Sequence, residues 1–183
     1  MASQISQAAL YHSVIFNDGK VTRNTWTDWY LIPSSRPVIV QPTPIYKYVE
    51  IPGRNGSLDL TDYLVGEPTY SDRKGSLEFI VVNNVGNYLD YGKKNNPKKP
   101  NDKSTFPHKA AESLGNWVAR KDVIADFLNG RKMKVTLEDD PEYYYYGRVF
   151  FKEWRADAQF SRVVIEYQLE PYKRYRDGKE AGL

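Results

Sequence analysis

The 183-residue sequence contains no cysteine, only two histidines and only two methionines. Without cysteine the chain cannot form a disulfide scaffold, a thiolate zinc site, an iron–sulfur cluster or a thiol nucleophile. Its longest aliphatic runs, such as 79–82, are far shorter than the ~20 residues of a membrane-spanning helix. The first seven residues are polar and uncharged, unlike a secretory signal. We therefore expect no membrane anchor and synthesis in the cytoplasm.

Sequence signatures of catalysis are also absent. His12 and His108 are far apart in unlike contexts, so neither a two-histidine metal site nor a Ser-His-Asp arrangement is indicated. No nucleophile elbow, P-loop, dinucleotide fingerprint or H-E-x-x-H occurs. The acidic residues of 138–142 lack calcium-loop spacing, and we interpret them as a turn rather than a metal site. We expect no enzymatic activity, no cofactor and no metal.

Aromatic residues, by contrast, are abundant. They make up 14% of the chain, with 15 Tyr and 4 Trp beside 12 Gly and 11 Pro, a composition that favours strands and turns. Apolar and polar residues alternate in several segments, as in strands with one solvated face. The expected extended segments are 10–17, 26–32, 38–40, 45–51, 75–82, 132–138, 143–154 and 161–170. The fold class that follows is mainly β with one α-helix, closed by three antiparallel strands.

Turn residues and one change of period complete the expected layout. Asp18-Gly19 is a two-residue hairpin signal, and Pro42 and Pro44 suit an edge strand or an arm. A period of 3.6 predicts one helix from Trp117, Val118, Val123, Ile124, Phe127 and Leu128, with Asn116 as its N-cap and Asn129-Gly130 as its stop. We expect a single domain over 1–183, with a polar arm at about 1–9 and a frayed end at about 174–183.

The net charge of +3 comes from one segment. Five lysines against one aspartate give 92–103 a charge of +4, which leaves −1 for the rest of the chain. The lysines are Lys93, Lys94, Lys98, Lys99 and Lys103. Such a Pro- and Asn-rich block reads as a solvated surface loop, and a basic loop facing an acidic protein partner is the sharper hypothesis. A nucleic-acid groove would need basic residues spread over a face.

The surplus of aromatic side chains points to assembly. A chain of this size cannot place all of its Tyr and Trp in one core, so some are expected in protein interfaces. Tyr143–Tyr146 could form a platform for a sugar or a base, but strand alternation turns half of them inward. Strand edges near the Pro-rich segment could pair with neighbouring copies in rings or filaments.

Several segments carry a resemblance to a known family. They are 24–37, 48–61, 66–73, 128–131 and 145–148, and the most telling run is Pro52-Gly53-Arg54-Asn55-Gly56-Ser57-Leu58-Asp59-Leu60-Thr61. This order resembles the N-terminal domain of distal tail (Dit) proteins of long-tailed bacteriophages. The likeness extends from about Asn24 to Arg148.

The resemblance implies a split-barrel-like or β-sandwich tail hub domain that forms a hexameric ring. Such a ring joins the tail tube protein to the tail-tip or baseplate hub protein, with a lumen for DNA and the tape-measure protein. The protein would be made in the bacterial host cytoplasm and reside in the virion tail. Family members often carry a further carbohydrate-binding domain, and the sequence ends before one, so direct sugar binding is not expected.

Two groups of residues are candidates for contacts in such a ring. Glycines shape an exposed turn at 52–56 beside apolar residues, which suggests an inter-subunit or tube-facing contact. The candidate interface residues are Arg36, Pro52, Gly53, Arg54, Asn55, Gly56 and Leu58. The lysines of 92–103 are the candidate partner-facing loop. Alternatives are another tail ring protein of the tube or neck, a carbohydrate-binding β-module, and a single-strand nucleic-acid binder.

Overall fold

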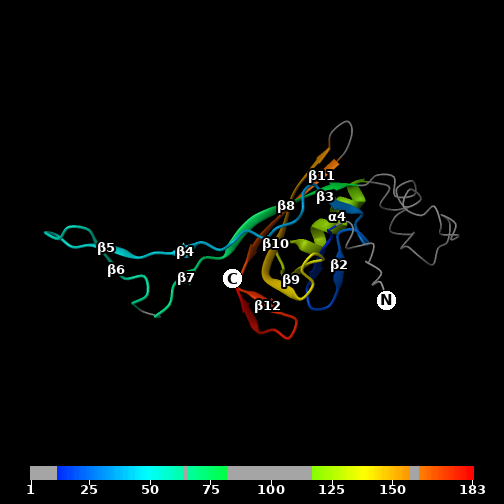
Figure 1. The fold of residues 1–183 in the computed structure, drawn as a ribbon. Coiled ribbons are helices and arrows are strands. Elements are labelled where there is room, and N and C mark those ends of the chain that lie inside the picture. The colour runs from blue at the N-terminus through cyan, green and yellow to red at the C-terminus, as the bar shows by residue number, and fades with distance from the viewer. Residues whose placement is uncertain (1–11, 64–65, 82–116, 157–160) are drawn as a thin grey trace, which may run out of the picture.

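The computed structural model describes residues 12–63, 66–81, 117–156 and 161–183 (Figure 1). Thirteen strands and one helix lie in these ranges. They are β1 (Val14–Asn17), β2 (Thr22–Asn24), β3 (Leu31–Pro33), β4 (Pro44–Ile45), β5 (Tyr48–Glu50), β6 (Ser57–Asp59), β7 (Thr69–Tyr70), β8 (Arg73–Val81), α4 (Trp117–Leu128), β9 (Lys132–Leu137), β10 (Tyr143–Ala156), β11 (Ser161–Leu169), β12 (Lys173–Tyr175) and β13 (Glu180–Gly182).

One antiparallel sheet forms the body of the molecule. Its strand order is β2-β1-β9-β10-β11-β8-β3, and β12 and β13 extend it beside the start of β10. The two ends of this order, β2 and β3, follow each other along the chain. The Leu31 amide donates to the Thr25 carbonyl at 2.8 Å, which ties the two edges together. The sheet therefore curls around one core, as expected of a split-barrel or β-sandwich domain, and the predicted mainly-β fold class is confirmed.

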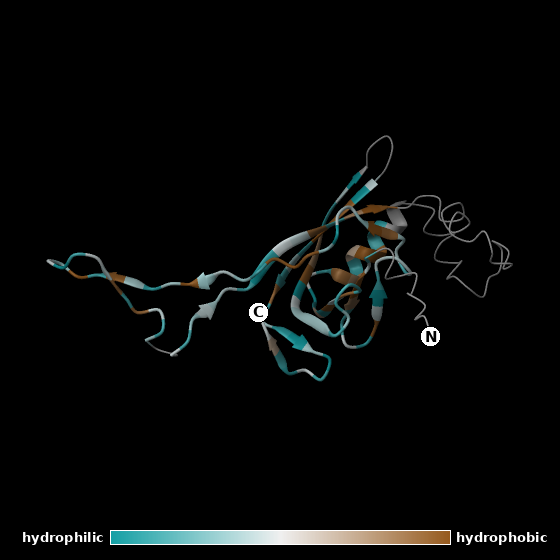
Figure 2. Cartoon of the chain, viewed as in Figure 1, coloured by the Kyte–Doolittle hydropathy of each residue, from teal (hydrophilic) through white to brown (hydrophobic). Residues whose placement is uncertain are grey.

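Strand alternation builds the core. In β9, Met133, Val135 and Leu137 are buried while Lys132 and Lys134 are exposed. The same alternation in β8 and β11 pairs Phe79 with Val163 and Leu77 with Ile165 inside the curl. Each such fully buried side chain stabilises the fold by about 1.5–3 kcal/mol. Figure 2 shows hydrophobic residues gathered in the strands and the helix of this body.

The predicted helix is present with its predicted stop. It begins at Trp117 and ends at Leu128, and Asn129 and Gly130 then take φ angles of 24° and 67°. Ile124 and Leu128 are fully buried in the core. Val123, assigned to the same apolar face, is 49% exposed, so the helix buries a narrower stripe than the sequence suggested. Asn116 lies outside the described residues.

Two expectations near the N-terminus are corrected. The hairpin of β1 and β2 exists, but Asn17 pairs with Thr22, so the loop has four residues rather than two. The Asp18 carboxylate accepts hydrogen bonds from the amides of Lys20 and Val21, which stabilises the longer loop. Residues 26–29, expected in a strand, form turns, because the chain must cross from β2 to β3 there.

The C-terminal segment 174–183 was predicted to be frayed, but it forms paired strands. β12 pairs with β10 through Tyr143 opposite Tyr175, and β13 pairs with β12. The rings of Tyr143 and Tyr175 lie 5.0 Å apart, and the Lys173 ammonium lies 4.1 Å from the Tyr143 ring centroid. Backbone pairing and these ring contacts hold a polar sequence in place, so the sheet does not end with β11.

Candidate interaction surface

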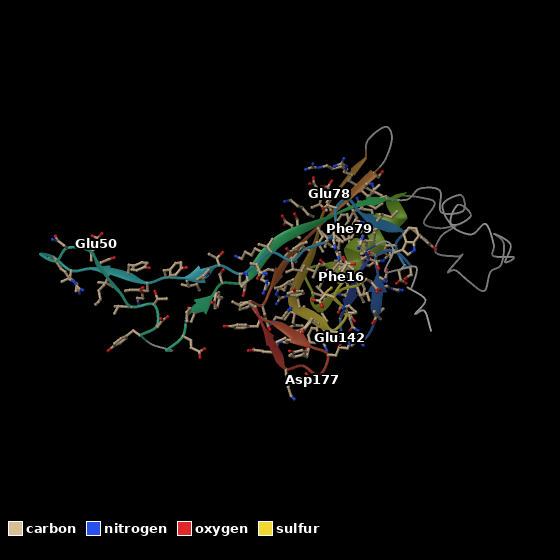
Figure 3. The ribbon with its side chains drawn as sticks, in the orientation of Figure 1. Phe16, Glu50, Glu78, Phe79, Glu142 and Asp177 are labelled. Carbon is tan, nitrogen blue, oxygen red and sulfur yellow. The ribbon has the colours of Figure 1, made fainter. Side chains whose placement is uncertain are left out.

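A long ribbon leaves the body between β3 and β8. We call residues 41–72 the arm; it carries β4 paired with β7 near the body and β5 paired with β6 at its far end. Figure 1 shows it projecting away from the curled sheet, and Figure 3 shows Glu50 at its far end while Phe16 and Phe79 lie in the body. The arm expected from Pro42 and Pro44 is therefore present.

The arm exposes apolar side chains on both of its faces. Segment 45–51 was expected to be one half-buried strand, but all of its residues are exposed, and it is divided between the end of β4 at Ile45 and β5 at 48–50. This correction has a simple cause: the alternation is real, but no part of the body covers either face. The exposed fractions are Ile45 50%, Tyr46 61%, Tyr48 58%, Val49 40%, Ile51 41% and Tyr63 80%.

Short ladders hold the arm together. Val49 lies opposite Leu58, the Leu60 amide donates to the Lys47 carbonyl at 2.8 Å, and the rings of Tyr46 and Tyr48 stack at 6.2 Å. A two-stranded ribbon without a covered face is marginally stable in water. An extended ribbon with several exposed aromatic and aliphatic residues is typical of a surface that another protein covers.

The charge of the arm differs from that of the rest of the chain. Its two basic residues, Lys47 and Arg54, stand against five acidic ones, which gives −3. These are Glu50, Asp59, Asp62, Glu67 and Asp72. Hydrogen bonds from the side chain and the amide of Thr61 lower the pKa of Asp59. Among the described residues, none of the ion pairs includes a residue of the arm.

The root of the arm is fixed to the body through Val40. The Val40 amide donates to the Tyr167 hydroxyl at 3.0 Å, and the Arg73 guanidinium donates to the Val40 carbonyl at 3.0 Å. Arg73, 1% exposed, also donates to the Pro171 carbonyl at 2.7 Å and lies 5.3 Å from the Tyr145 ring centroid. Burial raises the pKa of Tyr167, although the Val40 amide and Arg73 oppose that shift.

The structure separates the predicted interface residues into two places. Pro52, Gly53, Arg54, Asn55 and Gly56 form the connection from β5 to β6 at the tip of the arm, and Leu58 follows in β6. Arg36 lies instead on the body, where its guanidinium pairs with Asp139 at 2.7 Å. The same carboxylate contacts His12 at 2.7 Å. Arg36 is therefore not part of the arm, and the five lysines of 92–103 lie outside the described residues.

Sequence reasoning missed both the exposure of the arm's tyrosines and the residues that anchor the arm to the body. It assigned Tyr46 and Tyr48 to a half-buried strand, and it did not single out Arg73 or Tyr167 as arm anchors. Arg73 has the same strand phase as the inward-facing Leu77 and Phe79, and that phase could have signalled a buried cation. Tyr143–Tyr146 behave as the alternation indicated in part: Tyr145 packs against the core, and Tyr144, on the other face, is covered to 8% exposure with Lys134 over its ring.

Two other kinds of site, a metal centre and a membrane-spanning helix, were searched for among the described residues. No group of three or more His, Cys, Asp or Glu side chains there could hold a metal ion. No helix in that part of the chain has both the length and the hydropathy to cross a bilayer.

Similarity to known proteins is found in the comparison of structures and not in the comparisons of sequence. No protein-family model matches the sequence, and no curated protein sequence matches it. Among solved structures, the crystal structure of SPP1 Dit (gp 19.1) superposes with a TM-score of 0.50 at 17% sequence identity. The chain shares the fold of SPP1 Dit.

The match covers 88% of this chain and 52% of SPP1 Dit, so the chain spans about half the length of that protein. SPP1 Dit is described as a paradigm of the hub adsorption apparatus in phages that infect Gram-positive bacteria. At the level of the fold, the resemblance to distal tail proteins noted in the sequence is therefore confirmed.

Proposed function

We propose that this protein is a structural component of a bacteriophage tail and acts as a distal-tail-like ring subunit. Two independent lines support the proposal: the sequence resemblance over 24–148, and the fold shared with SPP1 Dit. The observation that carries it is the arm, an extended ribbon with exposed aromatic residues and uncompensated charge. Such a ribbon fits a chain that works by contacting other subunits.

The geometry of the arm favours a ring of identical copies. Its far end projects away from the described part of its own body, which leaves it open to a surface of another molecule (Figure 1). When each copy extends one arm to the next, the contact is heterologous, and rotational closure gives a ring. The resemblance supplies the expected number, a hexamer. Its partners would be the tail tube protein, the tail-tip hub protein and the tape-measure protein.

The charge distribution suits a conduit through which DNA passes without specific binding. Outside the lysine segment 92–103 the chain has a net charge of −1. Tight phosphate binding requires many Lys and Arg contacts and would retard passage. In this function the protein is not an enzyme and binds no cofactor, and the virion tail is its site of action.

The test is the assembly state of the purified full chain. We expect hexameric rings in negative-stain electron microscopy and a hexameric mass in solution. Arg54→Ala combined with Leu58→Ala should reduce ring formation, because these side chains lie at the far end of the arm. Lys20→Ala with Val123→Ala removes comparable exposed groups from the body and should leave the rings intact.

Two results would contradict this function. If the chain stays monomeric at high concentration, it does not form a ring. If the variant with Arg54→Ala and Leu58→Ala forms unchanged rings, the arm tip is not part of the interface. Immunogold labelling of tails then distinguishes the distal position from a tube or neck ring. Label confined to the end opposite the head is the expected outcome.

A further inference from the structure

The outer face of β9 and β10 carries a cationic strip. Lys132 and Lys134 project from β9, and Arg148 lies directly opposite Lys132 on β10. Tyr146 lies opposite Lys134, with the Lys132 ammonium 5.9 Å from its ring centroid, and Tyr144 is the next outward residue of β10, 8% exposed and covered by the Lys134 ammonium at 4.5 Å from its centroid. We call these five residues the Lys–Tyr strip.

The strip has no carboxylate partner in the described part of the chain, although the Arg148 guanidinium donates to the Gly130 carbonyl at 2.9 Å. Among the described residues, no carboxylate lies within 4.0 Å of the cations of Lys132, Lys134 or Arg148. The ladder neighbours of two of its cations are uncharged: Asn17 lies opposite Lys134, and Gln168 lies opposite Arg148. Arg174, opposite Tyr144, is paired with Glu170. Elsewhere on the body, Arg36, Arg162 and Arg174 each have a carboxylate partner.

The far end of the arm has the complementary character. Tyr48 pairs with Asp59 and Glu50 pairs with Ser57, so these four side chains share one face of the β5–β6 ribbon. That face presents two carboxylates and an aromatic ring that stacks on Tyr46. No ion pair within the described part of the chain involves Glu50 or Asp59.

The two surfaces also match in spacing. Glu50 and Asp59 are two rungs apart on the ribbon, and Lys132 and Lys134 are two residues apart on β9. Lys132 and Lys134 are about 7 Å apart along one strand, and Glu50 and Asp59, on opposite strands, are diagonal neighbours about 7–8 Å apart. Carboxylates on one surface can therefore meet ammonium groups on the other, while the exposed Tyr48 ring packs on the half-buried Tyr146.

We propose that the Lys–Tyr strip is the docking site for the β5–β6 end of the arm of a second copy of this chain. This inference rests on the proposed ring and names its two contacting surfaces. Each copy then gives its acidic arm to one neighbour and receives an arm from the other. Because every arm is acidic, two arms repel each other, whereas an arm and a Lys–Tyr strip attract each other.

Charge reversal on each surface tests the contact. The strip variant is Lys132→Glu with Lys134→Glu, and the arm variant is Glu50→Lys with Asp59→Lys. Each alone should weaken assembly at least ~10-fold by mass photometry, because like charges then face each other. The matched control is Lys20→Glu with Lys121→Glu, which has the same change in charge away from the strip and should assemble normally. Circular dichroism and thermal melts establish that each variant is folded.

Restoring the complementarity should restore the ring. A chain with all four reversals should assemble again, and so should an equimolar mixture of the strip variant and the arm variant, in alternating order. Rings of normal stability in the strip variant alone would overturn the docking site while leaving the proposed function intact. Loss of assembly without restoration in the four-reversal chain would overturn the arm as the occupant. If the native chain never assembles, the proposed function itself is contradicted, and the docking site falls with it.

Discussion

Gly147 shows how a single residue is dictated by the packing of strands. It lies in β10 between Met133 of β9 and Leu169 of β11. A Cβ at this position would overlap the Gln168 carbonyl oxygen and would lie 2.6 Å from the Leu169 Cα. Both obstacles are backbone atoms, so no side-chain rotation relieves them. The Gly147-Arg148 pair, a weak part of the sequence resemblance, thus has a steric reason.

We predict that Gly147→Ala destabilises the protein by about 1–3 kcal/mol, the usual range for overpacking a core, and toward its upper end because the obstacles are backbone atoms. The measurement is the midpoint and slope of urea unfolding. Gly19→Ala is the matched control, because Gly19 has a φ of 90° but nothing within 4 Å of its Cβ position. That control should lose only about 1 kcal/mol from backbone strain. Equal losses in the two variants would show that the strands can separate to admit a methyl group.

Asp139 is the residue whose charge matters most for acid stability. Burial raises the pKa of its carboxyl, but hydrogen bonds from His12 and Arg36 outweigh burial and hold the pKa below the ordinary 3.8. The carboxylate is 15% exposed, whereas His12 and Arg36 are 45% and 69% exposed, so solvent screens part of the attraction. A depressed carboxyl pKa stabilises the fold above the unfolded-state value and loses that contribution as pH falls through the folded-state value.

Asp139→Asn should therefore cost about 1 kcal/mol at pH 7, and the difference from the native protein should shrink as the pH falls from about 3.8 through the lower folded-state pKa of Asp139. Urea unfolding at a series of pH values measures this. Asp177→Asn, which removes an exposed carboxylate paired with Lys179, should have little effect throughout. A difference between Asp139→Asn and the native protein that persists undiminished at pH 3 would exclude ionisation of Asp139 as its source.

At the scale of elements, the arm root decides where the arm points. Both backbone groups of Val40 are bonded to side chains of the body, the amide to Tyr167 and the carbonyl to Arg73. Ile39, immediately before, is buried in the core. Gly75 permits the close approach, because a Cβ there would overlap the Tyr167 hydroxyl. A ring needs arms that leave each body in the same direction. The hydrogen bonds of Val40 with Tyr167 and Arg73 fix that direction.

Tyr167→Phe should loosen the root without removing the ring from the core. The Val40 amide then loses its acceptor, and an unpaired amide at this half-buried site costs about 1–2 kcal/mol. We expect faster hydrogen exchange at residues 39–41 and more rapid proteolysis of the arm. Tyr63→Phe, at an 80% exposed ring, is the control. Unchanged exchange at Val40 in the Tyr167 variant would mean that the hydroxyl does not hold the arm.

The elements that sequence predicted well are those whose surroundings are uniform. β9 and β11 alternate strictly because one face meets the core and the other meets water along their whole length. Segment 45–51 shows the same alternation, yet its partner surface is not in the same chain, and a pattern cannot say which molecule covers it. The pairing of β12 with β10 depends on backbone hydrogen bonds, which leave no hydrophobic pattern.

For the candidate site, the sequence identified the arm tip through its glycines but could not separate it from Arg36. Gly53 and Gly56 have φ angles of 81° and 80°, so the turn chemistry was readable. Arg36 belongs to the body because Asp139, more than a hundred residues later, returns beside it. Contacts of that sequence separation depend on the order of strands in the sheet, which no local pattern encodes.

For the whole molecule, charge is divided among regions rather than spread evenly. The arm carries −3 and the segment 92–103 carries +4, although the chain as a whole has only +3. A block of like charge that is not needed for the fold is favourable mainly where an acidic surface of another protein approaches it. We predict that the five lysines of 92–103 contact an acidic partner in the tail other than a second copy of this chain.

Changing Lys93, Lys94, Lys98, Lys99 and Lys103 to Gln keeps the length of the segment and removes its positive charge. Ring formation by the purified variant should be unchanged, because the arm and the Lys–Tyr strip remain. Incorporation into tails should fall at least ~10-fold, and binding of the native ring to the partner should weaken as salt rises. Changing Lys20, Lys121 and Lys179 to Gln is the control at body positions, of which Lys20 and Lys179 are exposed and Lys121 is half-buried. Normal tail assembly by the five-lysine variant would show that the basic segment is only a solvated loop.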